Sequence, residues 1–281
     1  MRYIALFAFL LLFLTFSFRT VSAGDPKPEE ILAKHYSSIG PAEKLQSLKT
    51  LFAGGASSFE VKNPIVRGGG KAVVVSDPNN LFFLMSLNSR EYPFEKIGMF
   101  GNKVDLPFIS SGTRSLLGTF LAEHSRVLSD NLFCGAMSLR WINNFAAGTK
   151  LKLSSTGSKK INNRKAYGIE VLLGTSSGEF SVRLFFDAEN FHHLRSEYKR
   201  DIPIRSVTFG RQNELANSHI ELTEEFSDFK DMDGLMLPYD YRVTFVSNSG
   251  DQTYSNSWEI KVINYLLNQK LEPGFFSFDT K

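Results

Sequence analysis

The feature that most constrains the fold is a series of three alternating runs between residues 219 and 267. In the middle run, apolar side chains occupy every second position: Leu235, Leu237, Tyr239, Tyr241, Val243 and Phe245. A period of two is typical of a β-strand with one buried and one solvated face. Turn-forming sequences at residues 231–234 and 248–251 separate the runs. The region therefore predicts a three-stranded antiparallel meander.

The first 23 residues have the organisation of a secretory signal. Arg2 precedes a nearly continuous apolar segment over residues 3–18, and Val21, Ser22 and Ala23 supply the small residues of a cleavage site. An uncleaved membrane anchor is the alternative, but the apolar segment is shorter than the roughly 20 residues of a spanning helix. We therefore expect export with cleavage after Ala23. No cysteine stands directly after the expected cleavage site to accept an N-terminal lipid anchor.

The rest of the chain, residues 24–281, is expected to form a single domain, because no linker or low-complexity segment divides it. Once Arg2 and Arg19 leave with the signal, 30 basic and 29 acidic residues give a charge of +1. That balance offers no electrostatic argument for nucleic acid as a partner. Cys134 is the only cysteine, so an internal disulfide is excluded and a buried free thiol is expected.

Phenylalanine is abundant, with 26 in the chain and five of them in the signal. The others could fill an ordinary packed core. They could also line a second apolar surface, such as a ligand cavity beside that core.

Two helical patterns interrupt the alternating runs. The first is expected to begin with Asp25 as N-cap and Pro26 at its first position, and to end at Gly40. The second begins near Ser111 and is the candidate lid; it places these residues on one face: Leu116, Leu117, Phe120, Leu121, His124 and Leu128.

The alternating runs predict roughly eleven strands. The first, over residues 49–61, is expected to bend at the paired glycines Gly54 and Gly55. Apolar residues on consecutive positions at 73–75 and 81–85 predict strands covered on both faces. The simplest architecture is a mostly β, α+β fold with one curved antiparallel sheet and helices against one of its faces.

No motif indicates catalysis, a metal or a cofactor. Residues 174–178 fit G-x-S-x-G but lie between two alternating runs, which favours a hairpin turn over a nucleophile elbow. His192 and His193 are adjacent on a predicted strand, so their side chains should point to opposite faces and not share one ion. Glu224 and Glu225 are expected at solvated or rim positions. We therefore expect a protein that is not an enzyme.

With these parts placed, the chain resembles the LolA/LolB-like carriers of lipoprotein sorting. The resemblance lies in the order of residues 30–45, 52–54, 114–121, 184–198, 228–238 and 275–276 along the chain. It implies a periplasmic protein built on an unclosed β-barrel whose apolar concave side, capped by helices, holds acyl chains. It also implies a lid-closing arginine, for which Arg67 is the nearest candidate. The missing lipid-attachment cysteine argues against the membrane-anchored form of the family.

The expected function is that of a carrier for a lipid or a lipidated protein, with transient membrane contact and other envelope proteins as further partners. The alternative is an envelope structural or interaction protein with a filled core. An apolar cleft of several hundred Å³ would favour carriage. The residues expected to line it are Phe52, Phe83, Met85, Val171, Leu184, Tyr241, Val243 and Trp258 from strands, and Leu117, Phe120 and Leu121 from the lid.

Overall fold

The computed structural model describes residues 25–62, 64–146, 149–173, 180–202, 218–249 and 252–278. Its helices are α1 (Pro28–Ile39), α2 (Ala42–Ser47), α3 (Leu116–Glu123), α4 (Arg126–Ser129), the 3-10 helix η1 (Gly135–Met137) and α5 (Leu139–Ala146). Its strands are β1 (Leu51–Lys62), β2 (Ile65–Ser76), β3 (Leu81–Ser86), β4 (Phe94–Phe100), β5 (Lys103–Asp105), β6 (Lys152–Ile161), β7 (Arg164–Leu172), β8 (Phe180–Asp187), β9 (His193–Ile202), β10 (Ser218–Met232), β11 (Leu235–Ser249) and β12 (Gln252–Leu267).

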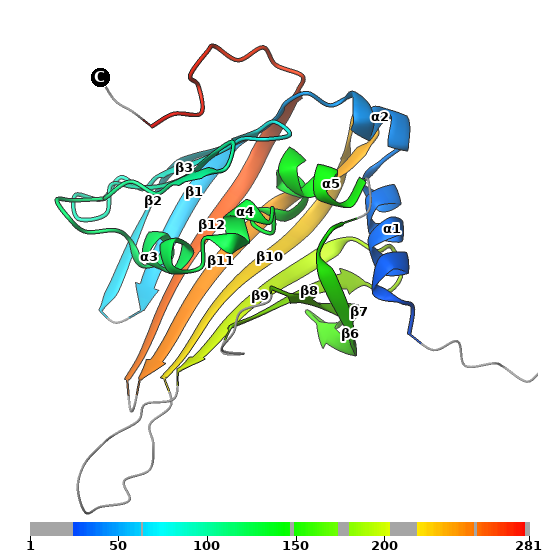
Figure 1. Cartoon of the computed structure of the whole chain (residues 1–281). Helices are drawn as coiled ribbons and strands as arrows, with labels where there is room; N and C mark the ends of the chain where they lie inside the picture. The colour runs from blue at the N-terminus through cyan, green and yellow to red at the C-terminus, as the bar shows by residue number, and fades with distance from the viewer. Residues whose placement is uncertain are drawn as a thin grey trace, which may run out of the picture.

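The strands form one antiparallel sheet in the order β5-β4-β3-β2-β1-β12-β11-β10-β9-β8-β7-β6 (Figure 1). Strands β5 and β6 stand at its two edges and do not pair with each other, so the described sheet curves without closing into a barrel. This confirms the predicted fold class, with twelve strands where the sequence predicted roughly eleven. None of the described helices has the length and apolar character needed to cross a membrane.

Strands β10, β11 and β12 are the predicted meander. Between β10 and β11, Asp233 and Gly234 have φ values of 51° and 72°, the left-handed geometry that a two-residue hairpin turn requires. The second turn contains residues 250 and 251, which lie outside the described residues, but Ser249 pairs with Gln252 on either side of them. The alternating pattern therefore predicted both pairing and direction correctly.

Strand β1 carries the predicted bend. It pairs with β2 on one side and β12 on the other, and its register against β12 shifts between Gly54 and Gly55. A Cβ atom on Gly55 would collide with the backbone carbonyl of Lys261 on β12, so only glycine allows this close approach. The bulge bends the strand that joins the first half of the sheet to the last strand.

Replacing Gly55 by alanine is expected to lower the free energy of unfolding by about 1–3 kcal/mol, because the new methyl group meets backbone atoms that cannot turn away. Gly54→Ala is the matched control, since a Cβ there meets the far edge of the Phe52 ring. Urea unfolding of the two variants measures the difference. Equal destabilisation would contradict the role assigned to Gly55.

The helical regions differ from the sequence prediction in detail. Helix α1 begins at Pro28 with Lys27 as its N-cap residue, so the prediction of Asp25 and Pro26 was wrong, whereas Gly40 does end the helix. The candidate lid is divided into α3, α4, η1 and α5. Helix α3 ends at Glu123, and the apolar face predicted over this region is therefore not continuous.

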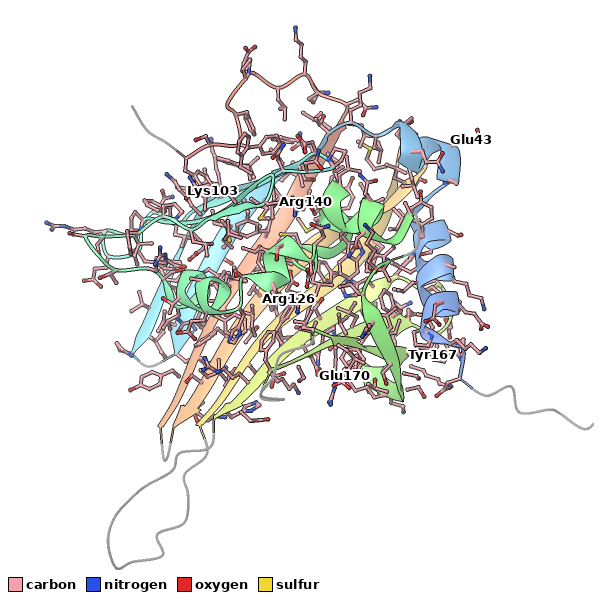
Figure 2. All side chains as sticks on the ribbon, in the orientation of Figure 1. Glu43, Lys103, Arg126, Arg140, Tyr167 and Glu170 are labelled. Carbon is pink, nitrogen blue, oxygen red and sulfur yellow. The ribbon has the colours of Figure 1, made fainter. Side chains whose placement is uncertain are left out.

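Helices α3, α4 and α5 lie over the concave face of the sheet, and side chains crowd the space beneath them (Figures 1 and 2). Trp141 on α5 and Phe133 are buried there, and Phe133 contacts the ring of Phe83 on β3. On the convex side, Phe275 and Phe278 of the C-terminal segment pack against Phe82 of β3. Strand β3 is thus covered on both faces, as its consecutive apolar residues predicted.

Candidate functional site

An apolar cleft opens between α3 and the end of the sheet where β10 and β12 begin and β11 ends. Its volume is about 490 Å³, and it is lined by Leu116, Thr119, Phe120, Glu123, Ile220, Phe245, Ser247 and Tyr254. Leu116 and Tyr254 are 45% and 46% exposed, respectively, although both are large apolar or aromatic side chains. A concave apolar surface of this volume is in the range of small-molecule sites.

The floor of the cleft continues the buried rows of the sheet. Phe245 follows Tyr241 and Val243 on the concave side of β11, and Ile220 precedes Leu222 by two positions on β10. From the helical side, Phe120 approaches the ring of Phe245 with a centroid distance of 6.1 Å. Among the described residues, the cleft is therefore the place where the buried row of the sheet continues beyond the helices that cover it.

One ion pair links α3 to the sheet beside the cleft. Arg200 on β9 donates from Nη1 to Glu123 Oε2 at 2.8 Å. The neighbouring His124 ring stacks flat on Phe180, with centroids 4.0 Å apart. Burial lowers the pKa of His124, and the nearby Arg200 lowers it further. His124 therefore contributes a neutral aromatic surface next to the cleft.

The beginning of α3 is held by a buried carboxylate. Ser115 is the N-cap residue: its Oγ accepts the Gly118 N–H at 2.7 Å and donates to Glu95 Oε1 on β4 at 2.8 Å. The Tyr92 hydroxyl donates to Glu95 Oε2, and the indole N–H of Trp258 donates to Tyr92 Oη at 2.8 Å. Burial raises the pKa of Glu95 to about 7, although these hydrogen bonds oppose the shift.

A second buried carboxyl, Glu224 on β10, holds the chain after α4. Its Oε1 accepts the Cys134 N–H at 2.8 Å and the Tyr241 hydroxyl at 2.6 Å, and its Oε2 lies 2.5 Å from Tyr198 Oη. Tyr198 Oη also lies 2.6 Å from the Leu132 carbonyl oxygen. We call residues 115–134, which run between these two glutamates, the cover segment.

The placement of Glu224 corrects the sequence prediction, because its side chain is 0% exposed and not at a solvated or rim position. Burial raises its pKa to about 7. Its neighbour Glu225 takes the predicted outer position and pairs with Arg195. The signal was present in the sequence: Glu224 shares the period of two with Leu222 and Phe226, which are both buried. The prediction for Glu224 followed its polar side chain and not its place in the alternating pattern.

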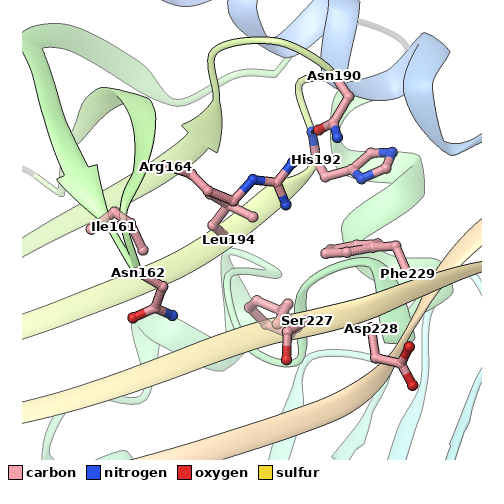
Figure 3. Close-up of a pocket in the computed structure, with 10 residues that line it drawn as sticks. Ile161, Asn162, Arg164, Asn190, His192, Leu194, Ser227, Asp228 and Phe229 are labelled. Carbon is pink, nitrogen blue, oxygen red and sulfur yellow. The ribbon is translucent and has the colours of Figure 1, made fainter.

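The two adjacent histidines occupy different environments. His193 is buried and stacks on Trp141, with ring centroids 4.3 Å apart. His192 stacks on Phe229 beside a more polar pocket of about 330 Å³, where Arg164 also lies (Figure 3). Within the described part of the chain, no three His, Cys, Asp or Glu side chains are arranged to hold a metal ion.

His35 of α1 connects this cluster to α5. Its Nε2 accepts the indole N–H of Trp141 at 3.0 Å, so its Nδ1 carries the hydrogen and donates to the Phe191 carbonyl at 2.9 Å. Burial lowers the pKa of His35 to about 4. The ring is therefore neutral, and its protonation would remove the acceptor that Trp141 requires.

Because the pKa of His35 is lower in the folded chain than the ordinary 6.5, its contribution to stability is present above pH 6.5 and is lost as the pH falls toward 4. The expected loss is on the order of 3 kcal/mol. The melting temperature between pH 6.5 and pH 4.5 measures it. His35→Gln should reduce this acid slope, and an unchanged slope in the variant would contradict the assignment.

Of the residues predicted to line a ligand site, Phe120 is the one that lines the cleft. The others on the concave side are buried beneath or beside the cover segment: Phe83, Met85, Leu117, Leu121, Val171, Leu184, Tyr241, Val243 and Trp258. Phe52 requires a correction, because it alternates with the buried Leu51 and Ala53 and therefore faces the convex side of β1. Its neighbours across the strands are Val75 and Leu266.

Other predictions concern residues away from the cleft. The side chain of Arg67 is 68% exposed and pairs with Glu60 of the neighbouring strand β1. Residues 174–178 lie outside the described residues. Strands β7 and β8, which flank them, do pair antiparallel. Cys134 is a buried free thiol, as predicted.

The sequence did not single out Leu116, Ile220, Phe245 or Tyr254 as site residues. Ile220 and Phe245 have the same period of two as the core rows, which could have placed them on the concave face. Whether they line a cleft depends on how far α3 extends over the sheet. Because α3 is distant from these strands in the sequence, no local pattern predicts this.

Comparisons with known proteins give distant structural matches only. No protein-family model matches the chain, and no curated protein does. A LolA superfamily protein from Nitrosomonas europaea matches with 15% identity and a TM-score of 0.46, covering 90% of this chain and 99% of that one. A domain from Vibrio parahaemolyticus assigned to outer membrane lipoprotein sorting matches with 12% identity and a TM-score of 0.44, covering 88% and 95%.

A DUF1329 family protein from Desulfovibrio piger matches with 11% identity and a TM-score of 0.40, covering 88% of this chain and 98% of that one. A LolA superfamily structure is thus among the matches.

Proposed function

We propose that the protein is an exported, non-catalytic carrier that binds the acyl chain of a lipid or of a lipidated protein in the cleft beneath α3. The observation that carries the proposal is the cleft itself, a concave apolar surface of about 490 Å³ that is open to solvent. Each methylene group moved from water into such a surface contributes about 0.8 kcal/mol. An acyl chain can therefore be bound without a polar recognition motif.

The cover segment supports this proposal because it is attached at separate points. Glu95 holds its first residue, Glu224 holds its last residues, and Arg200 pairs with Glu123 between them. The centre of the concave side is filled, so a chain longer than the cleft would need α3 to move outward. The buried residues Leu117 and Leu121 would then join Phe120 in lining the site.

The second candidate function is an envelope interaction protein without a ligand. The filled centre of the concave side favours it, since Trp141, Phe133 and Leu132 leave the interior closed. The cleft distinguishes the two functions. The half-exposed side chains of Leu116 and Tyr254, which line it beside apolar residues, favour the carrier. Lipid, lipidated proteins and other envelope proteins are the proposed partners, in the periplasm.

Replacing Leu116 by arginine is expected to weaken the binding of a fluorescent fatty-acid analogue at least tenfold, because a charge enters the cleft in place of apolar surface. Leu116 is already exposed, so the fold should tolerate the change. Ile263→Arg is the matched control, since Ile263 on β12 is 74% exposed and does not line the cleft. Fluorescence titration measures both affinities. Equal affinity of the two variants would refute the cleft as the binding site.

A further inference from the structure

If Glu224 were ionised, the two short oxygen–oxygen contacts of the Tyr198 hydroxyl would have only one hydrogen between them. Tyr198 Oη lies 2.6 Å from the Leu132 carbonyl oxygen and 2.5 Å from Glu224 Oε2. A phenol has a single hydrogen, and a carbonyl oxygen can only accept. If Tyr198 donates to Leu132, the contact with Glu224 is a hydrogen bond only when the carboxyl oxygen carries a hydrogen.

The other oxygen of Glu224 is already satisfied as an acceptor. The Cys134 N–H and the Tyr241 hydroxyl both donate to Oε1, at 2.8 and 2.6 Å. The amide hydrogen of Cys134 cannot turn away, which leaves Oε2 as the oxygen that can be protonated. A hydrogen there would donate to Tyr198, which would donate in turn to Leu132.

At Glu95 the hydrogen bonds run the other way, since both hydroxyl groups donate to the carboxylate. This site provides a comparison within the same protein. Tyr92 accepts the Trp258 N–H and donates to Glu95, and Ser115 accepts the Gly118 N–H and donates to Glu95. Each hydroxyl has one donor and one acceptor, so an ionised carboxylate completes the network. Burial raises both glutamate pKa values to about 7. The pKa values therefore do not separate the two sites, but the hydrogen-bond directions do.

We propose that Glu224 is a neutral acid while the cover segment is seated, that its hydrogen completes a relay through Tyr198 to the Leu132 carbonyl, and that its ionisation loosens the segment over the cleft. On ionisation, the proton leaves to water and the Tyr198 hydroxyl turns toward the charged oxygen, since a charge-assisted hydrogen bond is stronger. The buried Leu132 carbonyl then loses its partner.

The groups that face Glu224 carry no positive charge, although their hydrogen bonds oppose the upward shift of its pKa. They are Tyr198 on β9, Tyr241 on β11 and the Cys134 thiol, and burial raises the pKa of each well above its ordinary value. Ser196 on β9 lies between Glu224 and His193. Burial lowers the pKa of His193 well below its ordinary value, so this ring is neutral as well. A buried carboxyl in such surroundings favours its protonated form.

The direction of the pH effect follows from these facts. When the segment lifts and water reaches Glu224, its pKa returns from about 7 toward the ordinary 4.5. The seated state is therefore most favoured below pH 4.5 and weakens as the pH rises through about 7. The equilibrium constant for lifting rises up to tenfold per pH unit, for a limit of about 300-fold. Its effect on ligand entry rests on the proposed function, whereas the protonation of Glu224 does not.

Hydrogen exchange of peptides from residues 116–134, corrected for intrinsic exchange rates, tests the relay in the full-length secreted protein. Glu224→Gln should lie within about fivefold of the wild type at pH 5 and be more protected at pH 8, by up to about 300-fold. Its amide nitrogen donates to Tyr198 as the acid does, while its oxygen accepts from Cys134. Glu95→Gln is the matched control and should lose protection at every pH, because its amide hydrogens face hydroxyl donors.

The relay is overturned if Glu224→Gln loses protection at pH 5 as Glu95→Gln does, or if it coincides with the wild type at pH 8. Infrared spectroscopy gives a second measurement on the wild type. At pH 6 we expect a carbonyl band from the protonated carboxyl group of Glu224, which Glu95→Gln retains and Glu224→Gln removes. If only Glu95→Gln removes the band, the hydrogen is on Glu95 and the relay through Glu224 is overturned.

Binding of a fluorescent fatty-acid analogue separates the two proposals. Faster association with the wild type at pH 8 than at pH 5, with no such change in Glu224→Gln, supports the coupling to the cleft. If the exchange results are as expected but the analogue does not bind at any pH, the relay is supported and the proposed function fails. Binding with identical pH dependence in both proteins would overturn the coupling.

Discussion

Covering the concave face of the open sheet is the constraint on which the rest of the structure depends. An unclosed sheet of twelve strands presents a row of apolar side chains that water would otherwise reach. Helices α3 to α5 fill the centre of this face, with Trp141 and Phe133 completely enclosed. These helices do not extend over the end of the sheet where β10 and β12 begin and β11 ends. The cleft lies at that end, between α3 and these three strands.

The cover is attached through buried polar groups as well as apolar packing. Glu95 and Glu224 each join a different end of the cover segment to the sheet, and His35 joins α1 to α5 through Trp141. Buried polar groups are costly unless each has its partner, so these contacts specify one position for the cover. They also make that position sensitive to protonation, which apolar contacts alone would not.

Local patterns predicted the sheet well because strand pairing here is mostly between neighbours in sequence. The meander, the bulge at Gly54 and Gly55, and the covering of β3 on both faces were all readable from periodicity and turn residues. The predicted faces of Phe52 and Glu224 were wrong because they followed the residue type and not the alternation of buried and exposed positions along the strand. The cleft was not predictable, because it depends on how α3 meets strands about a hundred positions later in the chain.

The central claim is that the cleft accepts an acyl chain, and native mass spectrometry of the mature protein after incubation with phospholipid vesicles tests it most directly. We expect one added lipid mass per chain, which solvent extraction recovers, and a marked loss of it when Phe120 is replaced by arginine in a folded variant. A mass that remains that of the protein alone, with no lipid extracted from the wild type, would contradict the account. The concave face would then be a packed core and nothing more.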